Sequence, residues 1–420
     1  MADTEAGPSG SAPMLPHRQE HDHRRRTYSP RDWKGDCERT NSHWCLTGAV
    51  VTFLCAVSLI GLSEGWLEAM GLGRRMVHDK DCSSPEFSKQ TLKLLAEEPL
   101  QRLAVGLGTK KSEDQDFLGR FEGSGLVLSR DSSNYYVVFD NSFFLGKFAS
   151  ELTFHSTPGY NRSTNKILPW PDKSPDDVSG FEAITFNSSS GTYLVVQEAI
   201  RYRHSIFANV IEVDIDPTTD EVTQLGSCIA DYHFAADNKG FEGAGVLQHD
   251  NGKSYLLGLC EGNFCQGGSQ GRRAGHGRIV VMERQRDEGG NCTYSTVSVV
   301  PIPRDANFED YSDLSLRGKH VAIVSQASSA VWVGRFELVP EALGVMVLHP
   351  GRVWDFPRND LCQVKYCNVE GISWEAEDVI AAVSDRMKGK GRQHYRCWDK
   401  EQSLHAFAVN DKSLMRGGEL

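Results

Sequence analysis

The chain has 420 residues, of which 39% are hydrophobic and 24% are charged, and its formal net charge is −11 at neutral pH. This length allows one large domain with additional segments, and the hydrophobic fraction is ordinary for a globular fold. The negative charge argues against a protein that binds nucleic acid through a basic surface, so we expect no nucleic-acid partner.

The N-terminal part of the sequence predicts a tail followed by a membrane anchor. Residues 1–43 are rich in Pro, Gly, Ser, His and Arg and show no apolar period, which is typical of a disordered segment. Residues 44–62 carry no charge, and their length is about the ~20 residues that cross a bilayer. Basic residues are more frequent before this span than after it, which places the N-terminus in the cytosol. We therefore expect a single-pass, type II membrane protein, with a cleaved signal peptide as the alternative.

The cysteines agree with a domain in the secretory lumen or outside the cell. Eight of them follow the predicted span, and an even number in an oxidising compartment indicates disulfides. Cys260 with Cys265 and Cys362 with Cys367 are plausible local pairs. A zinc site is disfavoured because the sequence contains no CxxC pair. The eight cysteines are Cys82, Cys228, Cys260, Cys265, Cys292, Cys362, Cys367 and Cys397.

Three N-x-S/T sequons lie in the same region, at Asn161, Asn187 and Asn291. Together they predict a glycosylated domain of the secretory pathway.

Residues 63–104 are expected to form a stem with a short helix. Leu92, Leu95, Ala96 and Leu100 have helical spacing, and Pro85 stands where a helix would begin.

A repeated element then organises the chain. It combines a large apolar residue, an acidic residue and small residues, as in Phe241-Glu242-Gly243-Ala244-Gly245. The acidic residues of the five copies are separated by 60, 60, 71 and 57 residues. A period of this length indicates a repeat architecture. The five acidic residues are Glu122, Glu182, Glu242, Asp313 and Glu370.

Each repeat reads as four short strands joined by turns, with little helix. The second strands are the clearest, for example Tyr135–Phe139 and Ser254–Leu259, and His249-Asp-Asn-Gly252 is a good hairpin signal. Four antiparallel strands repeated five times describe an all-β fold, a β-propeller, over residues 105–412. We favour five blades. A sixth blade from residues 84–120 and a pair of packed sheets are the alternatives.

A second polar series follows the second strands, at Asp140, Glu198, Glu261, Gln326 and Asp385. The first strand begins where the second ends, so both series should share one face of the propeller and form an acidic throat.

Three interpretations of this throat stay open. The carboxylates can be structural acceptors for backbone N–H groups. They can bind Ca²⁺, for which Glu122, Glu182, Glu242 and Glu370 are the candidate ligands. They can also supply the acid and base of a hydrolase, as in glycosidases.

Basic loops follow the second strands and should surround the throat on the same face. They are either solvated loops or sites for an anionic ligand. The Gly-rich run 267–277 lacks the P-loop order, so nucleotide binding by that motif is excluded. The candidate anion-binding residues are Arg201, Arg203, Arg272, Arg273, Arg278 and Arg386.

Two pairs of elements resemble the SdiA-regulated family and the esterase-like, phytase-like propeller families. One pair is Phe181–Phe186 with Val195–Glu198, and the other is Glu370–Trp374 with Val383–Arg386. The resemblance implies a propeller in the secretory or periplasmic space, with a Ca²⁺ site or phosphoester hydrolysis. The fourth repeat departs from the pattern, because Ser312-Asp313 replaces Glu-Gly and Gln326 replaces the acid.

We therefore expect a membrane-anchored propeller that binds a ligand at one face, with Ca²⁺ in the central channel. The ligand class would be a small anionic molecule, a glycan or a protein. The alternative is a hydrolase that cleaves phosphoesters or glycosides with the acidic residues of the throat.

Overall fold

The computed structural model describes residues 82, 84–103, 121–150, 152, 165–174, 177–202, 205–234, 239–386, 397 and 400–409. The chain divides into two parts, Met1–Arg75 and Met76–Leu420, and every described residue belongs to the second part. The predicted tail and the predicted membrane span lie outside the described residues. Among the residues that are described, no helix is long and apolar enough to cross a membrane.

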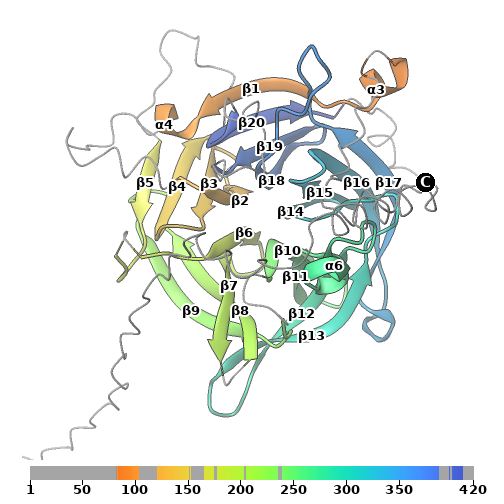
Figure 1. Ribbon diagram of the computed structural model, residues 1–420. Helices are drawn as coiled ribbons and strands as arrows, with labels where there is room; N and C mark the ends of the chain where they lie inside the picture. The colour runs from red at the N-terminus through yellow and green to blue at the C-terminus, as the bar shows by residue number, and fades with distance from the viewer. Residues whose placement is uncertain are drawn as a thin grey trace, which may run out of the picture. The chain divides into compact units, whose positions relative to one another are not determined.

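The second part is all-β and consists of consecutive four-stranded antiparallel units, seen around a common centre in Figure 1. Unit one contains β2 (Gly123–Leu128), β3 (Asn134–Phe139), β4 (Phe144–Ala149) and β5 (Lys166–Pro169). Unit two contains β6 (Phe181–Asn187), β7 (Thr192–Tyr202), β8 (Ser205–Ile215) and β9 (Val222–Ala230). Unit three contains β10 (Phe241–Gln248), β11 (Ser254–Cys260), β12 (Arg278–Arg286) and β13 (Cys292–Pro301).

The last two units complete the circle. Unit four contains β14 (Asp313–Arg317), β15 (His320–Ser325), β16 (Ala330–Leu338) and β17 (Met346–Asp355). Unit five contains β18 (Val369–Ala376), β19 (Val379–Ser384), β20 (Ser403–Ala408) and, as its outer strand, β1 (Lys93–Pro99). Short helical turns lie between strands: α3 (Pro85–Lys89), α4 (Leu100–Leu103), η3 (Asn263–Cys265), α6 (Gly268–Gly271) and η4 (Glu341–Leu343).

The first strand of each unit is innermost. β2 contacts β6, β6 contacts β10, β10 contacts β14, β14 contacts β18, and β18 returns to contact β2. This closed ring of inner strands is the arrangement of a β-propeller. Units two and three are also joined at their outer strands, where β9 and β13 pair in parallel at Ile229 with Thr293 and at Ala230 with Tyr294.

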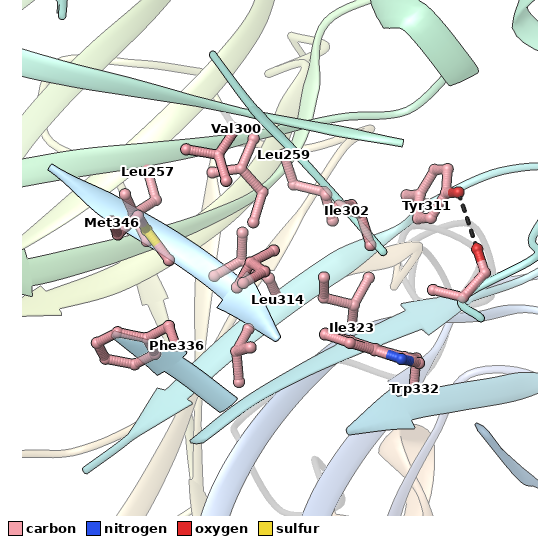
Figure 2. Packing of buried hydrophobic residues seen from close by; sticks show 14 of the residues in the cluster. Leu257, Leu259, Val300, Ile302, Tyr311, Leu314, Ile323, Trp332, Phe336 and Met346 are labelled. Atoms are coloured by element: carbon pink, nitrogen blue, oxygen red, sulfur yellow. Dashed lines mark hydrogen bonds between the residues drawn. The ribbon is translucent and has the colours of Figure 1, made fainter. Parts of the chain in front are cut away.

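Apolar side chains fill the space between neighbouring units, because each sheet is covered on both faces. Figure 2 shows the cluster between units three and four, where Leu257 and Leu259 face Leu314, Ile323 and Trp332. All five side chains are at most 2% exposed. Burial of a side chain of this size contributes about 1.5–3 kcal/mol, so these interfaces hold the ring together.

The N-terminal strand corrects the prediction for residues 84–104. Its helical spacing suggested a helix, but only Pro85–Lys89 and Leu100–Leu103 are helical, and Lys93–Pro99 is a strand paired with β20. Pairing with the last unit buries Leu92, Ala96 and Leu100, which explains the apolar pattern. The propeller therefore begins before residue 105, and the described residues 84–103 form no separate sheet.

Four disulfides stabilise the domain. Cys260 pairs with Cys265, as predicted, whereas the predicted pair Cys362–Cys367 is wrong. Cys362 instead pairs with Cys82, and Cys367 pairs with Cys397. Cys82 and Cys362 are 280 residues apart and are brought together by closure of the ring, whereas Cys367 and Cys397 lie 30 residues apart, before β18 and between β19 and β20. The fourth bridge, Cys228–Cys292, joins β9 to β13 across the seam between units two and three.

Two of the predicted glycosylation sites can be placed. Asn187 ends β6 at a hairpin, and Asn291 is exposed in the turn before β13. Asn161 lies outside the described residues.

Candidate functional site

A β-bulge in the inner strands determines which side chains share one level near the centre. The pairing of β10 with β11 shifts by one residue between Phe241 and Gly243, so Glu242 is left out of the ladder. The same shift occurs at the start of β2, β6 and β18. A bulge re-aims the residue that it leaves unpaired. The bulge residues are Ser124, Glu182, Glu242 and Glu370.

Unit four reaches the same position without a shift inside β14. Asp313 pairs with Val324 as Gly371 pairs with Val383, so Ser312 corresponds to Glu370. The repeated position therefore holds serine in units one and four and glutamate in the other three. Glu122 and Asp313, which the sequence period assigned to this series, do not occupy it.

The second polar series lies at the same end of the sheets. Four members directly follow a second strand, whereas Glu198 lies within β7, and the backbones of Asp140 and Glu261 tie one unit to the next. The carbonyl of Asp140 accepts a hydrogen bond from Gly180 N at 2.7 Å, and that of Glu261 accepts one from Tyr311 N at 3.0 Å. Glu198 lies over Gly240, where a Cβ would be 2.6 Å from Glu198 Cγ, so a larger residue at position 240 would require the Glu198 side chain to move.

The two series meet around a cavity of about 270 Å³, which we call the acidic cavity. Seven carboxyl groups and a single lysine line it. Six of the nine predicted throat residues take part, together with four residues that were not candidates. The lining residues are Asp140, Glu182, Glu198, Lys239, Glu242, Glu261, Asp310, Ser312, Gln326 and Glu370.

A hydrogen bond and an ion pair link neighbouring members of the acidic cavity. Gln326 donates its amide to Glu370, and Lys239 forms an ion pair with Glu261. One cation therefore faces seven acidic groups, and the cavity keeps a large negative potential.

The two central glutamates have raised pKa values. Burial raises the pKa of Glu182 well above its usual value, and the charges of Glu242 and Glu198 raise it further. Burial also raises the pKa of Glu242, with Glu261 and Glu198 adding to the effect and Lys239 opposing it. Charged carboxylates are unfavourable where water is scarce and like charges are close, so the protonated form of both groups is favoured.

An apolar layer beneath the acidic cavity explains the burial. The residue two positions after each bulge residue is apolar and at most 3% exposed. These side chains line a second cavity of about 260 Å³ farther along the inner strands. They are Leu126, Ile184, Ala244, Leu314 and Ile372.

Asp310 and Lys239 are members of the cavity that the sequence did not indicate. Asp310 accepts hydrogen bonds from Ser325 Oγ at 2.6 Å and from Ala327 N at 3.1 Å. Burial nevertheless raises its pKa to about 6. Both residues precede an inner strand rather than belonging to one. One sequence signal could have marked Asp310 as part of the repeated element: it stands two residues before Ser312, as Glu122 stands two residues before Ser124.

Three predicted throat residues do not line the acidic cavity. Asp313 is 2% exposed, and it accepts hydrogen bonds from Leu314 N and Ile372 N, both at 2.7 Å. Its role is structural, because it joins β14 to the inner strand of unit five. Asp385 is 1% exposed and accepts a hydrogen bond from Arg386 N. Glu122 contributes its carbonyl to Asp140 N at 3.1 Å.

The acidic cavity has the donor chemistry of a hard-cation site. Carboxylate, amide and hydroxyl oxygens are the ligands that Ca²⁺ prefers. Within the described residues, however, no three His, Cys, Asp or Glu side chains are gathered around one point as a metal's ligands. A cation would therefore have to draw the carboxylates inward and favour the ionised forms of Glu182 and Glu242, against the direction of their pKa shifts.

The predicted anion-binding residues are spread over three loops. Arg201 ends β7 and is exposed, and Arg386 follows β19 and is also exposed. Arg272 and Arg273 lie in the segment between β11 and β12, after the loop that Cys260–Cys265 closes, and Arg278 begins β12. Arg203 lies outside the described residues.

No protein-family model and no curated protein matches the sequence. Solved structures with a similar arrangement of strands are distant. The PQQ-bound aldose sugar dehydrogenase of Streptomyces coelicolor has a TM-score of 0.38 and 9% identity, over 74% of this chain and 98% of that chain. Glutaminyl cyclase of Myxococcus xanthus has a TM-score of 0.33 and 12% identity, over 76% and 98% of the two chains.

The β-propeller domain of Cps50 (Swd1) from Myceliophteria thermophila has a TM-score of 0.31 and 9% identity, over 69% of this chain and 96% of that chain. At these values, none of the three proteins assigns an activity to this chain.

Proposed function

We propose that the chain is a five-bladed β-propeller whose acidic cavity binds a divalent cation, with Ca²⁺ as the ion. The observation that carries the proposal is the gathering of seven carboxyl groups around one polar cavity at the level of the bulge residues. If these carboxyl groups served only as acceptors for backbone N–H groups, each would bind backbone N–H groups as Asp313 does. Those that line the cavity instead face one another, at an electrostatic cost that a bound cation removes.

Glu182, Glu198, Glu242 and Glu261 are the residues best placed to hold the ion, because all four line the acidic cavity and the strongest charges acting on Glu182 and Glu242 come from within this set. A bound Ca²⁺ supplies positive charge to the centre of the face, where it can attract an anionic group of a ligand. The protein's own residues orient that charge, since the bulges fix the glutamates and the ion pair with Glu261 holds Lys239 at the rim.

A melting experiment tests the cation site. The full chain is unfolded by heat in chelator and with increasing Ca²⁺ or Mg²⁺. A site that is filled to 100 times its dissociation constant stabilises the folded state by about 2.7 kcal/mol, so the midpoint should rise with Ca²⁺. Glu182→Gln should reduce the rise, and Glu122→Gln should preserve it, since Glu122 stands outside the cavity. An unchanged midpoint at millimolar Ca²⁺ would refute the proposal.

Hydrolysis of a phosphoester or glycoside is the second candidate function. The observation that favours it is that carboxyl groups with raised pKa values share one cavity with further carboxyl groups, and general acid and general base catalysis needs groups of differing pKa. Glu182, Glu242 and Asp310 have raised pKa values and open to the cavity. A panel of chromogenic phosphoesters and glycosides tests it. Turnover that is lost in Glu242→Gln, with unchanged melting, would support catalysis, and no turnover by the wild type would remove it.

We also propose that the domain is anchored as a type II membrane protein and faces the secretory lumen or the cell exterior. Four disulfides and the sequons at Asn187 and Asn291 support this location, because both modifications belong to that pathway. The resemblance to the SdiA-regulated and esterase-like propellers points the same way. A mature N-terminus near residue 65 would instead mean a cleaved signal, and resistance to endoglycosidase would exclude the glycans.

A further inference from the structure

The segment between β11 and β12 builds a compact cluster on the same side as the acidic cavity. Cys265 is bonded to Cys260, which ends β11 next to the cavity residue Glu261. Phe264 N donates to His276 O at 2.9 Å, and the two rings stack with centroids 4.3 Å apart and planes at 20°. The loop is thereby folded back on itself, with an aromatic pair at its centre.

Guanidinium groups surround this pair. The Cζ atoms of Arg273 and Arg278 lie 5.7 and 5.4 Å from the centroid of the Phe264 ring. Burial lowers the pKa of His276, and the charges of Arg304, Arg273 and Arg278 lower it further. Three positive charges therefore act on one imidazole. We call Phe264, Arg273, His276, Arg278 and Arg304 the Phe264 cluster.

The cluster has no acidic counterpart in the described part of the chain. Among the residues that the structure describes, Arg273, Arg278 and Arg304 form no ion pair with a carboxylate. Arg278 Nη1 donates to the carbonyls of His276 and Gly277 at 3.0 and 2.8 Å, and Arg273 Nη1 reaches Gln270 Oε1 at 3.4 Å. These acceptors are neutral. In a chain with a net charge of −11, three arginines that leave their charge uncompensated are unexpected.

The cluster also borders the acidic cavity. Gly262 and Asp310 form a β-bridge, and Asp310 lines that cavity. Gly275 N donates to Phe308 O at 3.3 Å, which brings the loop of Arg273 onto the segment that carries Arg304. A positive and a negative site thus share one face, and a ligand of mixed charge or a cation–anion pair could occupy both.

We propose that the Phe264 cluster is a binding site for a tetrahedral oxyanion, the phosphate or sulfate group of a ligand that lies across this face. A guanidinium presents paired N–H donors that match two oxygens of such a group, and Arg is the residue preferred for this contact. Phe264 and the backbone bonds of Arg278 hold the donors in place, so little order has to be gained on binding. The site does not require the cation, which distinguishes this inference from the proposed function.

The test measures binding of inorganic phosphate and inorganic sulfate to the full chain in chelator, by calorimetry. We expect saturable binding that falls by about tenfold in Arg273→Ala, the loss of one charge-assisted contact. Arg273→Lys keeps the charge but not the paired donors, and should recover part of the affinity. Arg272→Ala is the matched control, because Arg272 is the exposed neighbour in the same loop and stands outside the Phe264 cluster. Equal binding by the two alanine variants would overturn the proposal.

A second readout reports the site directly. An anion beside His276 favours the imidazolium form, so phosphate should raise the pKa of His276 in an NMR titration. Sulfate should also raise the pKa of His276 if the site recognises charge alone. A shift with only one of the two anions would show which oxyanion the site prefers. An unchanged His276 titration at saturating phosphate and sulfate overturns the proposal. Binding in chelator with no Ca²⁺ response would leave the anion site standing while the cation site fails.

Discussion

Replacement of Asp310 by asparagine tests whether the acidic cavity is electrostatically unfavourable in the absence of a ligand. Burial raises the folded-state pKa of Asp310 from 3.8 to about 6, against the hydrogen bonds from Ser325 and Ala327. Between these two values the unfolded chain loses the proton while the folded chain keeps it. The folded state therefore loses stability as the pH rises through this window, and the full loss is present above pH 6.

The magnitude follows from the shift. One pKa unit corresponds to about 1.4 kcal/mol, so a shift of about two units costs about 3 kcal/mol at pH 7.5. Asp310 is only partly buried, which lowers the effective cost. The amide of an asparagine at this position would keep an oxygen for Ser325 and lose about 1 kcal/mol of charged hydrogen bonding. We therefore expect Asp310→Asn to stabilise the chelated protein by about 1–2 kcal/mol, or about 2–5 °C in the melting midpoint.

The assay is denaturant unfolding of the full chain in chelator at pH 4.5 and pH 7.5. The gain in free energy of unfolding should be small at the lower pH and reach its maximum at the higher pH. Asp250→Asn is the control, since it makes the same chemical change at an exposed turn far from the cavity. Destabilisation by Asp310→Asn at pH 7.5, or a gain independent of pH, would refute the reasoning.

Three further substitutions probe the framework. Burial raises the pKa of Glu97, but hydrogen bonds from His405 and Lys400 outweigh burial and lower the pKa to about 2. Glu97→Gln should therefore lower the free energy of unfolding, measured with denaturant, by about 2 kcal/mol at pH 7 and by about nothing at pH 2. Asp313→Ala should cost about 2–4 kcal/mol in the same assay, because it leaves buried N–H groups such as that of Ile372 unpaired. Replacing Cys260 and Cys265 together by serine should lower phosphate affinity several-fold while the melting midpoint falls only slightly, because the bridge closes a loop of few residues.

The sign of the Glu97 prediction depends on which partner is charged. Burial lowers the pKa of His405, so its imidazole is neutral at pH 7 and acts on Glu97 as a hydrogen-bond donor. Lys400 supplies the charge. Stability from Glu97 is then complete above about pH 4.5 and is lost as the pH falls toward 2. A midpoint for Glu97→Gln equal to that of the wild type at pH 7 would show that the network does not hold β1 to β20.

The repeat fold was accessible from the sequence because strands buried on both faces leave a strong local pattern. The second strand predicted at Tyr135–Phe139 is β3, Asn134–Phe139, and the one predicted at Ser254–Leu259 is β11, Ser254–Cys260. The N-terminal strand was missed for a physical reason. Lys93–Pro99 has the composition of a helix, and only pairing with β20, some 300 residues later, makes it a strand.

The sequence predicted the end of the sheets at which the acidic side chains gather, but not which residue of each inner strand points toward the centre. The sequence period treats every acidic residue near an inner strand as equivalent, whereas a bulge decides which side chain turns toward the centre. Glu122 precedes the bulge residue Ser124 by two positions, and Asp313 follows Ser312 by one. A shift of one residue changes the face of a strand, so neither could be assigned without the pairing.

This register also makes the acidic cavity asymmetric, which bears on where a cation would lie. Serine at the bulge position of units one and four removes a carboxylate there, and Glu370 is engaged by Gln326. The charges that most raise the pKa values of Glu182 and Glu242 are those of Glu198, Glu242 and Glu261, all in units two and three. The Phe264 cluster is built from the segment between β11 and β12 of unit three, the first residue of β12, and Arg304, which follows β13. Positive and negative potential are therefore concentrated in the same sector, and a bound ligand should lie over units two and three rather than on the axis of the ring.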